Sequence, residues 1–197
     1  TEDENIDYKD GVLYHKNDPE LKMSLKEIAA LLGDTGGPIT GKSHINPGGQ
    51  EGSYAANIVD VKVDPETGKV EILKVTAFQD VGKAIHRGYV EGQIQGGTTQ
   101  GLGWAINEEY FMLDGQMKNN TFLDYRMPTS LDLPMIDPVV IEVFNPNHPF
   151  GVKGVGESNI VPPLGAVSDA VYNAIGKRIY DLPINPEAII RAINGKL

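Results

Sequence analysis

The segment 151–163 concentrates the residue types that could do chemistry. It reads Gly-Val-Lys-Gly-Val-Gly-Glu-Ser-Asn-Ile-Val-Pro-Pro, and Glu157 is its only acid. Its three glycines permit positive φ angles and close approach of a ligand to the backbone. A helix beginning near Pro163 would add free N–H groups and a partial positive charge. The segment therefore suits an anion or a catalytic carboxylate, although an ordinary strand-to-helix turn with a solvated glutamate has the same pattern.

A second glycine-rich segment, 89–109, has the apolar spacing of a helix but contains five glycines. Each interior glycine costs a helix about 1 kcal/mol relative to alanine, so another interaction must offset the loss. Two explanations remain open: the helix packs closely on a neighbouring backbone, or a flat ligand lies against it, with Gln93 and Gln100 offering amide groups. We expect 92–103 to be partly helical, with glycines that approach a ligand or another backbone.

Three separated motifs resemble a known family. They are Glu91–Gly103, the Leu-Asp-Tyr-Arg-Met-Pro-Thr run at 123–129, and Gly-Val-Gly-Glu at 154–157 with the following Pro-Pro. Their order and spacing resemble the C-terminal part of the large subunit of the xanthine oxidase and aldehyde oxidase family of molybdenum hydroxylases. The resemblance is good from about residue 55 to residue 194.

This resemblance implies an oxidoreductase that hydroxylates a heterocycle or aldehyde carbon with oxygen from water. Glu157 would be the catalytic general base, since a glutamate in a dry pocket is a stronger base than one in water. Gln93 occupies the position of the glutamine that contacts the pterin. No side chain would ligate the metal. The candidate cofactor-binding residues are Gln93, Gly96, Gly97, Gln100, Gly154, Val155 and Gly156.

The resemblance also implies a cofactor and partners. The cofactor would be molybdopterin with molybdenum, in the cytosine dinucleotide form, and Fe–S and FAD centres would lie on partner chains. Family features of the upstream half of the large subunit have no counterpart before Tyr54. We therefore expect half of an active site, inactive alone, that needs the remainder of the subunit or a split partner. A separately encoded subunit, a cleavage product and an excised domain are all compatible with this expectation.

The amino-acid composition excludes several classes of function. A net charge of -10 argues against a general nucleic-acid or anionic-membrane surface. The absence of cysteine excludes disulfides, thiolate zinc sites and protein-ligated Fe–S clusters on this chain. The four histidines show no ligand spacing, and His148 is interpreted as a solvated loop residue. The sequence contains no apolar run of 18 residues, and we expect a cytoplasmic protein.

Two alternative functions remain open from the sequence. Gly36–Ser43 satisfies the P-loop pattern, with Lys42 as its lysine, and would make the chain a nucleotide-binding protein. The context is unfavourable, because a helix pattern precedes the segment and glycines and a proline follow it. The other alternative is a structural partner module, in which the glycine-rich segment only packs.

The expected fold is α+β, with antiparallel and mixed hairpins and packed helices, divided into 1–50 and 51–197. In the first part we expect a hairpin around Asp10-Gly11 and a short helix capped by Ser24 and ended by Gly33. The second part should hold the sheet and the larger helices. Its expected elements begin with antiparallel strands 54–63 and 69–78, with a bulge or a change of face between Ile72 and Val75. A hairpin over 109–120, a buried strand 139–144, a helix 163–176 ended by Gly176 and a helix 185–195 capped by Asn185 should follow.

Overall fold

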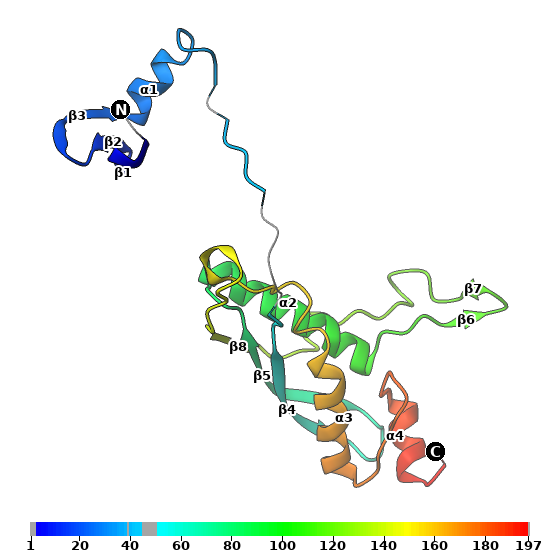
Figure 1. Ribbon diagram of the computed structural model, residues 1–197. Helices are drawn as coiled ribbons and strands as arrows, with labels where there is room; N and C mark the ends of the chain where they lie inside the picture. Colours follow the sequence, from blue (N-terminus) through cyan, green and yellow to red (C-terminus); the bar gives the residue numbers. More distant parts are fainter. Residues whose placement is uncertain (1–2, 39, 45–50, 197) are drawn as a thin grey trace. The chain divides into compact units, whose positions relative to one another are not determined.

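The computed structural model describes residues 3–38, 40–44 and 51–196. It divides into two compact units, Thr1–Asn46 and Pro47–Leu197 (Figure 1). The first is a small sheet followed by one helix, and the second contains a mixed sheet and three helices. The expected α+β class is confirmed, whereas the assignment of 1–50 and 51–197 as separate domains stays a prediction.

The first unit is a three-stranded antiparallel meander that follows a single 3-10 turn, η1 (Asp3–Asn5). Its strands are β1 (Ile6–Lys9), β2 (Val12–His15) and β3 (Asp18–Ser24). Asp10 and Gly11 both have positive φ, 49° and 82°, as a tight two-residue hairpin turn requires. The expected hairpin is confirmed. The sequence analysis missed β3, whose residues are nearly all exposed and show no clear alternation.

A capping box starts helix α1 (Leu25–Leu31) as expected. The backbone N–H of Glu27 donates to Ser24 Oγ at 3.2 Å, and Glu27 Oε2 accepts from the Ser24 N–H at 2.9 Å. The helix ends before Gly33. Residues 40–44 downstream are not helical, and Ile39 lies outside the described residues. Because a P-loop lysine must stand at the start of a helix, the geometry around Lys42 does not support nucleotide binding.

The sheet of the second unit has the strand order β4-β5-β8 and is mixed. Its strands are β4 (Ala55–Val63), β5 (Val70–Asp80) and β8 (Ile136–Ile141). β4 pairs antiparallel with β5, and the register passes from Asp60–Lys74 to Val61–Ile72. Leu73 is therefore the extra residue of a bulge, which confirms the expected irregularity.

Helix α2 (Arg87–Ile106) crosses from β5 to the parallel strand β8. It and α3 (Pro162–Ile175) pack against the sheet face that carries the buried β5 residues Val75 and Ala77 (Figure 1). The expectation that 92–103 is only partly helical was wrong, since the whole segment is helical. Tertiary packing thus overrides the low helix propensity of its glycines.

Strand β8 begins three residues earlier than the expected strand 139–144. Pro138 lies inside it, in register with Ala77 of β5. β8 is an edge strand, so a proline that lacks the N–H donor is tolerated there. The strand ends at Ile141, and 142–148 form a loop. No residue of 139–144 is buried, so the expected buried strand was wrong in both position and burial.

The remaining elements follow local signals. Asp114 and Gly115 form the turn between β6 (Met112–Leu113) and β7 (Gln116–Met117) with φ of 51° and 72°. Gly176 ends α3 in the left-handed conformation, and Asn185 caps α4 (Pro186–Ile193) by accepting from the Ala188 N–H. All three expectations are confirmed. None of the helices in the described part of the chain has the length and apolar character needed to cross a membrane.

Candidate functional site

The two glycine-rich segments of the sequence meet in the structure. Gln93 Nε2 on α2 donates a hydrogen bond to the backbone oxygen of Gly156 at 2.8 Å. Gly154, Gly156 and Glu157 are exposed, as is Gln93. The contact places one face of α2 directly beside the residue that precedes Glu157. The candidate base and the candidate pterin contact therefore belong to one surface, although they lie 64 positions apart in the sequence.

The first glycine of the loop serves the fold. Gly151 is the last residue of the short 3-10 turn η2 (Pro149–Gly151) and has a φ of 72°. Its carbonyl accepts from the Lys83 N–H at 2.9 Å, and the Lys153 N–H donates to Val81 O at 2.9 Å. A Cβ on Gly151 would collide with the Phe144 ring. Gly151 therefore anchors the loop to the end of β5, and only the later glycines of the loop face open space.

A buried ion pair ties the same loop to β5. Lys153 Nζ lies 2.7 Å from Asp80 Oδ2, and Asp80 Oδ1 accepts from the N–H groups of Gly82 at 3.0 Å and Val143 at 3.2 Å. Burial would raise the pKa of Asp80, but the hydrogen bonds from Lys153 and the two N–H groups outweigh it and hold that pKa below its ordinary value. In turn, the bond to Asp80 raises the pKa of Lys153.

Two further polar residues under the loop were missed by sequence reasoning. Gln79 and Asn159 are almost completely buried, and Asn159 Nδ2 donates to Gln79 Oε1 at 2.6 Å. Gln79 Nε2 donates to Gly154 O at 3.2 Å. The sequence does contain one signal for them. Gln79 and Asp80 follow the apolar residues of a strand, and polar groups that are buried there need hydrogen-bond partners.

Helix α2 presents two different glycine surfaces. A Cβ on Gly101 would collide with the carbonyl oxygen of Ile160, and one on Gly103 would collide with the Pro128 ring. Gly97 is buried and faces Asn159 and Ile160 at ordinary contact distance. In contrast, a Cβ on Gly92 or Gly96 would meet no atom within 4 Å. The packed surface lies against the chain itself, and the open surface adjoins the Glu157 loop.

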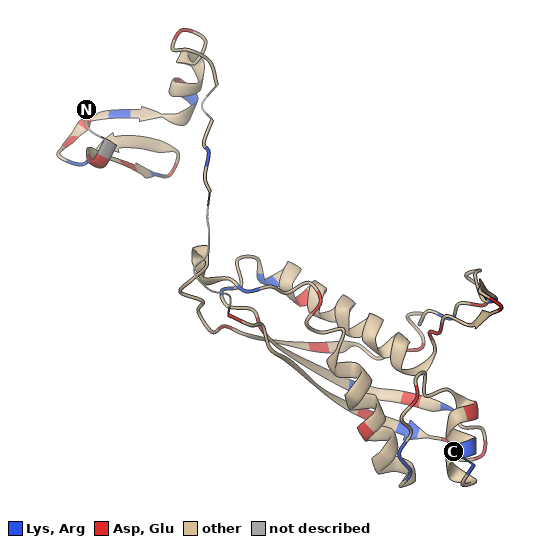
Figure 2. Ribbon diagram, turned by 45° about the vertical axis from the view of Figure 1, so that its right-hand side comes forward, with Lys and Arg blue, Asp and Glu red and all other residues tan. Residues whose placement is uncertain are grey.

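The open surface of α2 carries little charge. Figure 2 shows the helix in tan, the colour of uncharged residues, beyond its N-terminal part, and its only charged residues are Arg87 and Glu91. These two form an ion pair with each other at 2.8 Å. A neutral surface of exposed backbone and amide side chains could hold a large anionic ligand without repulsion from negatively charged side chains.

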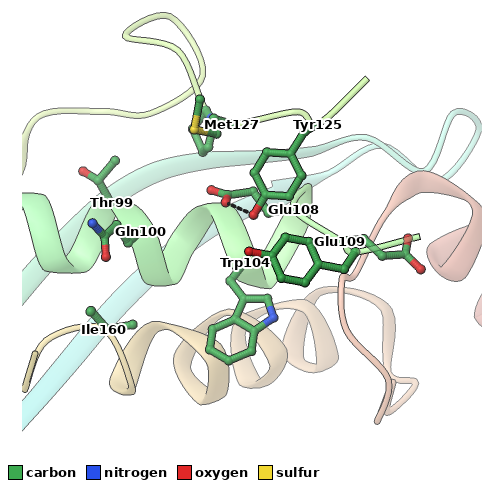
Figure 3. Close-up of a pocket in the computed structure, with 10 residues that line it drawn as sticks. Thr99, Gln100, Trp104, Glu108, Glu109, Tyr125, Met127 and Ile160 are labelled. Atoms are coloured by element: carbon green, nitrogen blue, oxygen red, sulfur yellow. Dashed lines mark hydrogen bonds between the residues drawn. The ribbon is translucent and has the colours of Figure 1, made fainter. Parts of the chain in front are cut away.

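Gln100 lies farther along α2, at a hollow of about 610 Å³ shown in Figure 3. Aromatic and apolar side chains line much of it, including Trp104, Tyr125 and Met127. Tyr125 Oη donates to Glu108 Oε2 at 2.7 Å. This hydrogen bond and burial raise the pKa of Tyr125 to about 12. Gln100 and the motif at 123–129 thus line the same hollow, while Gln93 contacts the Glu157 loop.

Metal-ligating residues are not gathered at the site. Within residues 3–38, 40–44 and 51–196, no group of three or more His, Asp or Glu side chains is placed to hold a metal ion. His148 is exposed in its loop, as expected. The arrangement offers one free carboxylate, neutral amides and open backbone.

Comparison with known proteins identifies the family. The model of the molybdopterin cofactor-binding domain matches residues 1–134. A putative xanthine dehydrogenase molybdenum-binding subunit, XdhA, of Escherichia coli K12 is 33% identical over 175 residues, which are 86% of this chain and 23% of that protein. The nicotine 6-hydroxylase large subunit of Paenarthrobacter nicotinovorans is 38% identical over 147 residues, which are 73% of this chain and 18% of that protein.

A solved structure agrees with these relatives. Quinoline 2-oxidoreductase from Pseudomonas putida 86 superposes with a TM-score of 0.83 at 31% identity, covering 97% of this chain and 26% of that one. The chain thus spans about a quarter or less of the length of the proteins that it matches. The match also includes residues before 55, where the sequence motifs were weak. The chain belongs to the molybdopterin cofactor-binding domain family of the xanthine dehydrogenase and aldehyde oxidoreductase type.

Proposed function

We propose that this chain forms one wall of a molybdopterin site in a molybdenum hydroxylase and supplies Glu157 as the general base. The observation that carries this proposal is the 2.8 Å hydrogen bond from Gln93 to Gly156, which joins the two motifs in one exposed surface. The family membership supports the cofactor class. The proposed assignment of Glu157 rests on its being the only acid of the loop.

The open glycines support the fit of the cofactor. Gly96, Gly154 and Gly156 have nothing within 4 Å of the place where a Cβ would stand, so a planar pterin could approach their backbone. Gln93 and Gln100 would offer amide donors and acceptors, and Val155 would contribute its backbone. Gly97 faces the protein interior, and we propose that it brings α2 close to Asn159.

When bound, the molybdenum cofactor would supply the two-electron redox chemistry. The chain's own contribution would be a proton acceptor at a Glu157 carboxylate oxygen. Glu157 is exposed in this chain, and cover by the cofactor and a further polypeptide would remove water from it. Because burial disfavours the charged form of a carboxylate, that cover would make Glu157 a stronger base near neutral pH.

The rest of the enzyme belongs to the same proposal. Since the chain spans about a quarter or less of its relatives, we propose that the remainder of the large subunit or a split partner completes the site. Fe–S and FAD centres would lie on partner chains, and the cofactor would be the cytosine dinucleotide form in a cytoplasmic enzyme. The relatives' names include xanthine, nicotine, quinoline and aldehyde, which favours a heterocycle or aldehyde substrate. The chain alone would be inactive.

The test is Glu157→Gln in the assembled enzyme. The amide keeps the size of the side chain but does not accept the proton, and a positioned base contributes about 10² to 10⁴ in rate. We expect the rate of enzyme reduction by substrate, per bound molybdenum, to fall by at least about 10²-fold with molybdenum content unchanged. Glu71→Gln is the matched control, because Glu71 is exposed and lies at the start of β5, whereas the Glu157 loop contacts the end of that strand.

Two results would contradict the proposal. A Glu157→Gln enzyme that reduces at more than about a tenth of the wild-type rate would show that Glu157 is not the base, because the loss is smaller than a positioned base provides. A parallel loss of molybdenum and rate, with a normal rate per molybdenum, would assign Glu157 to cofactor retention instead.

A further inference from the structure

Two buried amide side chains support the loop that carries Glu157. Gln79 is the second-last residue of β5 and is fully buried, and Asn159 is 1% exposed. Asn159 Nδ2 donates to Gln79 Oε1 at 2.6 Å. β5 is the central strand of its sheet, so the Gln79 backbone has a neighbouring strand on each side, with Ala55 of β4 and Val140 of β8 as its partners in register.

Gln79 contacts the loop on both sides of Glu157. Its Nε2 donates to Gly154 O at 3.2 Å, three residues before Glu157, and its Oε1 accepts from Asn159, two residues after it. Gln93 adds a third contact at Gly156. The backbone on which Glu157 stands is therefore held from β5 and from α2.

A carboxamide is the side chain that meets these requirements. Gln79 Nε2 also donates to Ser53 Oγ at 3.2 Å, and Ser53 Oγ accepts from Ser158 Oγ at 3.2 Å. The site thus uses two donors and one acceptor of a single buried group. Glutamate would lack the donors, and methionine of similar length would lack both functions.

We infer that Gln79 is a positioning residue for Glu157, an inference that rests on the function proposed above. Glu157 projects from a loop and not from a helix or strand. The place of its carboxylate relative to a bound substrate therefore depends on the backbone of 154–159. Misplacing a reacting group by about 1 Å can cost about 10²-fold in rate.

The test replaces Gln79 by Met in the assembled enzyme and in the 197-residue chain. In the enzyme we expect turnover per bound molybdenum to fall roughly 10-fold to 100-fold, with a much smaller change in KM. In the chain we expect faster amide hydrogen exchange over 153–160. Val75→Ala is the control, because Val75 is buried in the same strand but offers the loop no hydrogen bond; it should lower the thermal midpoint and leave both readouts unchanged.

A second variant keeps the inference testable if Gln79→Met fails to accumulate. Asn159→Asp has the same shape but presents an acceptor to Gln79, so the Gln79 amide could no longer satisfy Asp and Gly154 O together. It should produce the same two changes, smaller in size. Unchanged amide hydrogen exchange over 153–160 in both variants would overturn the inference that Gln79 holds the loop.

The two proposals fail in different ways. Faster exchange with wild-type turnover per molybdenum, while Glu157→Gln is inactive, would overturn the positioning role and leave the proposed function standing. An active Glu157→Gln enzyme would overturn the proposed function and the positioning role together, and the exchange data on the chain would still report whether Gln79 holds the loop.

Discussion

Most described glycines of the second unit fall into one of two groups with opposite surroundings. In the packed group, an added Cβ would collide with other parts of the chain; its members are Gly68, Gly82, Gly101, Gly103 and Gly151. In the open group, an added Cβ would meet no atom within 4 Å, and the residues are exposed; its members at the site are Gly92, Gly96, Gly154 and Gly156. Glycine therefore has two roles in this unit: it allows close packing at some positions and leaves the backbone exposed at others.

The difference separates fold from function. The packed glycines allow α2 to touch the backbone of Ile160 and allow the end of β5 to pair with Val152, so the chain itself explains them. The open glycines of α2 cost the helix about 1 kcal/mol each relative to alanine and are offset by no contact with the described part of the chain. A ligand that lies on them is the explanation consistent with the family.

The largest expected effect on stability comes from a substitution in the packed group. Gly101→Ala should lower the free energy of unfolding of the chain by about 2 kcal/mol or more, because the clash with Ile160 O exceeds the gain in helix propensity. Gly96→Ala, five positions earlier on the same helix, should raise it by roughly 0.5–1 kcal/mol. Urea unfolding of both variants measures the contrast. Equal changes in the free energy of unfolding for Gly101→Ala and Gly96→Ala would contradict the division into packed and open glycines.

The next effect concerns Asp80, which holds the packed Gly82. Asp80→Asn removes the 2.7 Å partner of the buried Lys153 ammonium and leaves it only Glu51, whose Oε2 lies 3.7 Å away, so it should cost about 2 kcal/mol at pH 7. The exposed Asp60→Asn on β4 is the control.

The pH dependence has a definite sign. The pKa of Asp80 is depressed in the folded state, so its stabilisation is present above the ordinary value of about 3.9 and is lost as the pH falls through the folded value. The wild type should therefore lose more stability than Asp80→Asn below about pH 4. Parallel acid unfolding curves would contradict the role of Asp80 in the ion pair.

Local features of the fold could be predicted from the sequence. The Asp10-Gly11 turn, the Ser24 capping box, the bulge at Leu73 and the Asn185 cap each depend on residues a few positions apart. Strand β3 lacks such a pattern. The start of β8 is hard to predict because Pro138 usually interrupts a strand and is tolerated here only at the sheet edge.

The site was only partly predictable for a physical reason. The motifs pointed to Gln93 and to the Glu157 loop, but their contact joins separate elements and cannot be read from spacing. Gln79 and Asn159 are 80 positions apart, and each alone looks like an ordinary polar residue. Likewise, the spacing of the α2 glycines did not tell the packed Gly101 from the open Gly96, because that depends on where Ile160 lies.

The most direct test of the division between the two groups is Gly96→Leu in the assembled enzyme. Leucine is a good helix former, and residue 96 is exposed with no atom within 4 Å of an added Cβ, so the thermal midpoint of the isolated chain should be unchanged or slightly higher. Its side chain would fill the space that we assign to the cofactor, so bound molybdenum per protein should fall severalfold. Wild-type molybdenum content in Gly96→Leu, or a loss of molybdenum matched by a loss of chain stability, would contradict the assignment of the open glycines to a ligand.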